Sequence, residues 1–197
     1  MGSIREATRP QTFIFGEIES GSFPDYNEAC CSWRLVHGSG SNVVEGDYSG
    51  ESVVAMLPSV TPGHLTWNHS IDIHLATRSF DQWPTFEFTI RGKDHHCRSA
   101  FIGYGSAKLP VQPGRHDMKV RIWKPLAKPS WTERLRVWLL DAAPELVDAS
   151  KEITNINNRG SLTYESAGFI TLSLNIVNVD FVENGVYVQQ PGDLTFS

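Results

Sequence analysis

The sequence predicts an all-β protein built as an antiparallel β-sandwich, on three observations. Short runs alternate apolar and polar residues, which is the pattern of strands with one buried face. Turn-forming pairs separate several of these runs, at Pro62-Gly63, Trp83-Pro84 and Pro113-Gly114. The chain has 197 residues, 40% of them apolar, which is enough for one sizeable core. Short strands at regular spacing are typical of a sandwich.

Six runs carry the alternation. The first, Thr12 to Ile18, places Phe13 and Phe15 on the same face of the expected strand. The other five lie at residues 31–35, 71–75, 85–90, 118–122 and 170–176. A period of two predicts strands because an amphipathic helix would repeat near 3.6 residues. The segment from Gly38 to Gly50, between the second and third runs, is rich in glycine and serine, so we expect a flexible loop there.

One segment, near residues 130–140, is expected to be a short inserted amphipathic helix. Ser130 and Glu133 have the spacing of a capping box. The apolar residues that follow share one helical face, and basic residues lie beside them. The favoured interpretation is that this stripe covers the protein's own sandwich, which is the commoner fate of an amphipathic helix. The alternative is a candidate partner-binding or membrane-binding surface. The candidate residues are Trp131, Leu135, Trp138, Lys128 and Arg134.

The charge balance and the cysteines limit the classes of function. The net charge is -5, so general electrostatic attraction to nucleic acid is disfavoured. No apolar run approaches the roughly 20 residues of a membrane-spanning helix, and the N-terminal residues lack the apolar stretch of a signal peptide. The three cysteines are odd in number and two are adjacent, which indicates free thiols in a reducing compartment.

The stretch Gly92 to Gly105 holds the densest group of metal-ligating side chains, Asp94 to Cys97. Neighbouring side chains on an extended chain point to opposite faces, so His95, His96 and Cys97 cannot easily reach one ion. A solvated turn is therefore the favoured interpretation, and a metal site is the alternative. The following Gly103-x-Gly105 lacks the third glycine and the helix of a dinucleotide loop, which favours a structural role.

No enzyme signature is present. The chain has no Gly-x-Ser-x-Gly elbow, no His-Glu-x-x-His motif and no Walker loop. We therefore expect a protein that is not an enzyme and has no catalytic residues or cofactor. A catalytic site assembled across the fold stays open as an alternative, because such sites are spatial and not sequential.

Four stretches together resemble the B9 domain family of ciliary transition-zone proteins. They are GEIESGSFPDYNEACCSWRLVHG (16–38), LTWNHSIDIHLATRSFDQWPTFEFTI (65–90), GYGSAKLPVQPGRH (103–116) and GFITLSLNIV (168–177). The resemblance implies a single C2-type sandwich over residues 13–188, and we expect flexible ends at 1–12 and 189–197. It also implies a scaffold at the cytoplasmic side of the ciliary base, in the transition zone and basal body.

The partners that the resemblance implies are other B9-domain paralogues, namely B9 domain-containing protein 2 and Meckel syndrome type 1 protein, together with tectonic-type proteins. Such a complex supports ciliogenesis and the diffusion barrier of the ciliary membrane. The alternative function is a peripheral membrane module that binds lipid directly.

A C2-type fold raises the question of calcium, which takes about six to eight oxygen ligands from several carboxylates. Asp25, Asp47, Asp81 and Asp94 each stand alone in expected loops, so no calcium site is expected. The turn from Asp94 to Arg98 is also where this chain departs from the aromatic-Gly pair that is common in the family. We expect that turn to have a shape of its own.

Overall fold

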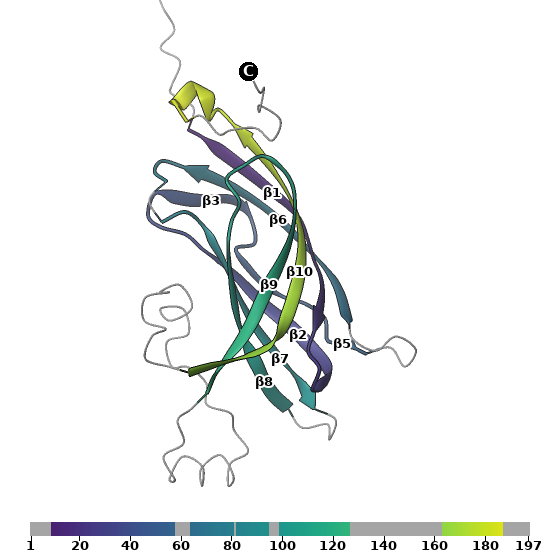
Figure 1. Cartoon of the computed structure of the whole chain (residues 1–197). Coiled ribbons are helices and arrows are strands. Elements are labelled where there is room, and N and C mark those ends of the chain that lie inside the picture. The colour runs from purple at the N-terminus through teal and green to yellow at the C-terminus, as the bar shows by residue number, and fades with distance from the viewer. Residues whose placement is uncertain (1–8, 58–63, 81, 95–98, 127–162, 187–197) are drawn as a thin grey trace, which may run out of the picture.

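The computed structural model describes residues 9–57, 64–80, 82–94, 99–126 and 163–186 as an all-β fold (Figure 1). Ten strands form one curled sheet in which every pairing is antiparallel. The strands are β1 (Gln11–Ser22), β2 (Tyr26–Val36), β3 (Ser41–Gly46), β4 (Ser49–Glu51), β5 (Ala55–Met56), β6 (Leu65–Thr77), β7 (Thr85–Asp94), β8 (Ser99–Lys108), β9 (Gly114–Leu126) and β10 (Thr163–Val179). No helix in these ranges is long and apolar enough to cross a membrane.

The sheet folds over into two leaves that pack face to face. The first leaf has the order β3-β6-β1-β10-β9, and the second continues as β8-β7-β2-β4, with β5 also pairing with β2. The leaves join where β8 meets β9, through the pair Tyr104–Trp123. They are also connected across the core, because the indole N–H of Trp67 on β6 donates to the carbonyl oxygen of Ala29 on β2 at 2.9 Å. The fold is therefore the antiparallel β-sandwich that the sequence predicts.

The core confirms the alternation in five of the six runs. The apolar side of each run is buried between the leaves, where its side chains interlock with those of the opposite leaf. The side chains that are at most 6% exposed include Trp33, Leu35, Ile71, Ile73, Leu75, Phe86, Phe88, Ile90, Val120, Ile122, Ile170, Leu172, Leu174 and Ile176.

The first run is a strand as predicted, but its two phenylalanines face outward. Ile14 and Ile18 of β1 are fully buried, whereas Phe15 is 44% exposed. Phe13 stacks on His74 of the neighbouring β6, with ring centroids 4.1 Å apart. Both faces of this run are apolar, and the compact β-branched residues are the ones that fill the space between the leaves.

The segment Gly38 to Gly50, which composition predicts to be a flexible loop, instead contains a strand. Residues Ser41 to Gly46 form β3, which pairs with β6, and β4 begins at Ser49. Partners far away in sequence supply the hydrogen bonds of β3, and local composition does not reveal such partners. The helix expected near residues 130–140 lies outside the described residues. Within them, the helical element is a 3-10 turn, η2 (Val182–Asn184).

Candidate functional site

The residues proposed from sequence as a binding surface are not placed by the structure. Trp131, Leu135, Trp138, Lys128 and Arg134 all lie outside the described residues. The same holds for the turn residues 95–98, which include the two histidines and the cysteine of the rejected metal motif. Among the residues that are described, no three His, Cys, Asp or Glu side chains come together as a metal site would require.

Gly103 and Gly105 have the structural role that the sequence predicted. Both lie in β8, which continues as a strand to Lys108 instead of opening a helix. A Cβ atom on Gly103 would lie 2.7 Å from the carbonyl oxygen of Trp123, and one on Gly105 would lie 2.5 Å from Cδ1 of Ile122. These glycines therefore allow β9 to approach β8 closely at the seam between the leaves.

The adjacent thiols of Cys30 and Cys31 lie on opposite faces of β2 and cannot act together. Burial raises the pKa of the fully buried Cys31 thiol well above its ordinary range. Cys30 is only partly buried; burial, its hydrogen bond to Glu51 and the Glu51 charge all raise its pKa. Its Sγ lies 3.4 Å from Oε1 of Glu51. Both thiols stay protonated near neutral pH, which makes them poor nucleophiles and poor metal ligands.

Residues 44–56 form an exposed surface segment, which we call the acidic edge. It runs from the second half of β3, through β4, to β5. Its backbone is fastened to β2 by N–H groups on either chain: Leu35 donates to Tyr48, Ser52 to Cys31 and Leu57 to Asn27, at 2.7, 2.9 and 2.8 Å.

A bulge between β4 and β5 shapes this edge. At Ser52 the backbone N–H still donates to Cys31, but the side-chain Oγ is the atom that accepts the N–H of Cys31, at 2.9 Å. The same hydroxyl donates to the carbonyl oxygen of Val53 at 2.9 Å. The strand is interrupted at this point, and Val53 and Val54 are pushed outward. Bulges of this kind are a device by which edge strands avoid open-ended pairing.

The acidic edge combines exposed apolar side chains with negative charge. Its large apolar side chains are 54–70% exposed, a high value for such residues in one continuous segment. They are Val44, Tyr48, Val53, Val54 and Met56. The same segment contains the carboxylates Glu45, Asp47 and Glu51 and no lysine, arginine or histidine. Such a surface is suited to a partner with apolar and basic groups.

None of the expectations from the sequence includes this surface, although the sequence contains a signal for it. Two Val-Val pairs, Val43-Val44 and Val53-Val54, break the alternation of buried and exposed positions. Adjacent strand residues face opposite sides, so at least one valine of each pair must leave the core or lie in a bulge. A bulge occurs at each pair. One is the bulge beside Val53 and Val54, and the other lies where the β3–β6 register shifts between Val43 and Glu45.

Comparisons with known proteins agree on one family. The B9-C2 family model, "Ciliary basal body-associated, B9 protein", matches residues 12–177. The chain is 28% identical to B9 domain-containing protein 1 of Mus musculus, over 91% of this chain and 88% of the relative. It is 27% identical to B9 domain-containing protein 2 of Homo sapiens, over 89% of this chain and 98% of the relative.

Among solved structures, a C2 domain of plant extended synaptotagmin 1 is similar, with a TM-score of 0.47 and 9% identity. That alignment covers 87% of this chain and 98% of the synaptotagmin domain.

Proposed function

This chain belongs to the B9 family of ciliary basal body-associated proteins, and we propose that it is a non-catalytic scaffold subunit at the ciliary base. In this proposal it assembles with other B9-domain proteins, such as B9 domain-containing protein 2 and Meckel syndrome type 1 protein, and with tectonic-type proteins. The assembly lies on the cytoplasmic side of the transition zone and supports ciliogenesis and the membrane diffusion barrier.

The observation that supports this proposal is the acidic edge. Exposed Val53, Val54 and Met56 are 61–70% accessible and would be desolvated by a partner. The bulge at Ser52 interrupts the ladder, so we propose side-chain packing, instead of continuous strand addition, as the mode of contact. The partner surface would supply apolar side chains and lysine or arginine opposite the three carboxylates.

A pull-down from ciliated cells tests the proposal. The full chain should recover the other B9-domain proteins, and the double variant Val53→Glu, Val54→Glu should lose them. Two added charges on an apolar contact should lower the affinity by at least about tenfold, because burying an unpaired charge is costly.

Val182→Glu is the matched control, since Val182 is 65% exposed and lies in η2, outside the acidic edge. The control should bind as the unchanged protein does, and all three should melt at the same temperature. Recovery of no B9-domain protein by the unchanged chain would refute the scaffold role. Equal binding by the double variant would refute the assignment of the contact to the acidic edge.

A further inference from the structure

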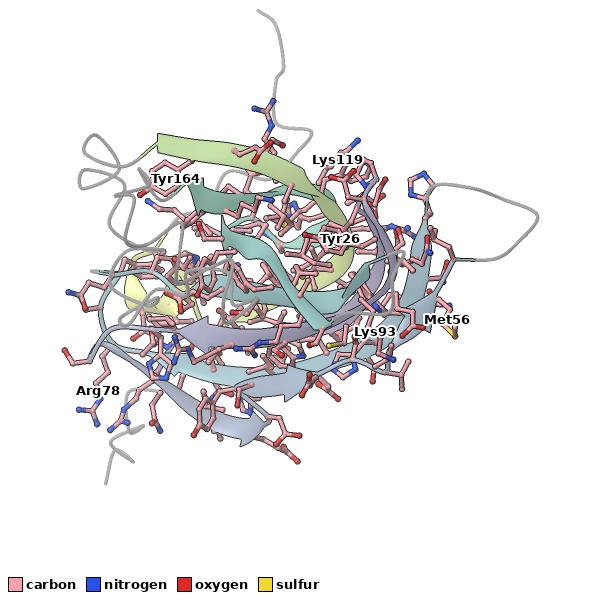
Figure 2. All side chains as sticks on the ribbon, turned by 90° about the horizontal axis from the view of Figure 1, so that it is seen from below. Tyr26, Met56, Arg78, Lys93, Lys119 and Tyr164 are labelled. Carbon is pink, nitrogen blue, oxygen red and sulfur yellow. The ribbon has the colours of Figure 1, made fainter. Side chains whose placement is uncertain are left out.

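A polar pocket of about 250 Å³ lies at the place where β1 and β3 begin and β6 ends. We propose that this pocket binds a phosphate group. The pocket lies away from the β5 end of the acidic edge, because Figure 2 places Arg78 and Met56 on opposite sides of the molecule. The inference goes beyond the scaffold role and does not depend on it. The lining residues are Arg9, Ser39, Gly40, Ser41, Asn42, Ala76 and Arg78.

The fold brings these residues together through backbone contacts. The N–H of Thr77 donates to the carbonyl oxygen of Pro10 at 2.8 Å, which holds the end of β6 beside the residue after Arg9. The N–H of Arg78 donates to the carbonyl oxygen of Gly40 at 2.6 Å, which fixes the turn before β3 against the same strand end. The two arginines are far apart in sequence, yet their backbones are held in place before any ligand arrives.

The charge of the pocket favours an anion. Two arginines, Arg9 and Arg78, are among its lining residues, and its described lining contains no carboxylate. Across the part of the chain that the structure describes, neither Arg9 nor Arg78 takes part in an ion pair. The whole chain carries a net charge of -5, so the pocket is a locally positive region of an acidic protein.

The remaining side chains suit phosphate more closely than a carboxylate ligand. Arginine binds phosphate oxygens in a bidentate manner, and two guanidinium groups match the charge of a phosphate monoester. Ser39 and Asn42 add neutral hydrogen-bond donors to the lining. The volume is below the roughly 300–1,000 Å³ of pockets that enclose a whole small molecule. A charged group therefore fits better than an entire cofactor.

The phosphate could belong to a lipid headgroup or to a compound in solution, and the chemistry of recognition is the same for both. Two probes distinguish the sources. One is inorganic phosphate, titrated into the full chain and followed by calorimetry. The other is sedimentation with phosphatidylcholine vesicles, prepared with and without phosphatidylinositol 4-phosphate.

We expect saturable binding of at least one probe, and an affinity that is lowered by at least about tenfold in Arg78→Gln. Arg121→Gln removes the same charge from an exposed position on β9, outside the pocket, and should bind as the unchanged protein does. Binding only to the phosphoinositide vesicles would identify a lipid headgroup as the source, whereas binding of inorganic phosphate alone would identify a compound in solution.

Saturation by neither probe would overturn the proposal. Equal loss of binding in Arg78→Gln and Arg121→Gln would overturn it as well, because the binding would then follow net charge and not the pocket. Asn42→Asp provides a second variant, since an added carboxylate in the exposed pocket wall should repel phosphate without disturbing the core.

Discussion

Replacing Ser52 by alanine would remove the hydroxyl that shapes the acidic edge. That hydroxyl accepts the N–H of Cys31 and donates to the carbonyl oxygen of Val53. The two hydrogen bonds differ in their consequence. Cys31 is fully buried, so its N–H would lose its acceptor where water cannot replace it, at a cost of about 1–3 kcal/mol. Val53 is 70% exposed, so water can bond to its carbonyl group and little is lost there.

We therefore expect Ser52→Ala to lower the free energy of unfolding by about 1–3 kcal/mol, and not by the sum of two hydrogen bonds. Urea unfolding followed by tryptophan fluorescence measures the change. Ser49→Ala, on the exposed side of β4, is the matched control and should stay within about 0.5 kcal/mol of the unchanged protein.

Amide hydrogen exchange provides a local readout of the same bond. The N–H of Cys31 should exchange faster in Ser52→Ala. The amides of β10 should exchange faster only by as much as the lower global stability of the variant requires. If Ser52→Ala and Ser49→Ala are equally stable and the Cys31 amide exchanges as before, the reasoning about the bulge is refuted.

Three further predictions concern the seam, the buried thiol and calcium. Gly103→Ala should destabilise the protein by about 1–3 kcal/mol, and by more than Gly105→Ala does. The new methyl group at position 103 would clash with the backbone of Trp123, whereas the one at position 105 would meet the movable end of the Ile122 side chain. Equal urea midpoints for the two variants would contradict this prediction. The pKa of Cys31 is raised in the folded protein, so the thiol's contribution to stability is complete below its ordinary pKa of 9.0 and is lost as the pH rises above 9.0. Above pH 9 the unchanged protein should therefore lose more stability than Cys31→Ala. Parallel stability profiles of the two proteins against pH would contradict this prediction. Calorimetry should detect no calcium binding in the micromolar range, as proposed from the isolated carboxylates; a saturable heat would show that proposal to be wrong.

The sequence predicted the strands whose two faces differ in chemistry. Ile71, Ile73 and Leu75 alternate with polar residues, so their common face could only be the buried one. The orientation of the first strand could not be predicted in this way. Phe13 and Phe15 on one face and the isoleucines on the other are both apolar, and only the packing of two leaves decides which set is enclosed.

The candidate surfaces were harder to predict because they depend on contacts between distant parts of the chain. Composition made the segment from Gly38 to Gly50 look like a loop, yet β6 and β2 hold it as strands through backbone hydrogen bonds. The pocket depends on Arg9 and Arg78, which no local pattern connects. The B9 resemblance, by contrast, rests on stretches that are continuous in sequence, and the family match over residues 12–177 confirms it.

The pairing of β1 with β10 determines how this sandwich bears a mechanical load. Gln11 lies opposite Val179, so the chain enters and leaves the sheet side by side. Tension between these two points would load the hydrogen bonds of the pair one at a time, beginning at the outer end, as in peeling. Strands pulled from opposite ends would share the load in shear. Such a domain would yield readily when it is stretched between Gln11 and Val179, and it would bear force better through neighbours packed against its sides than through this pair of strands.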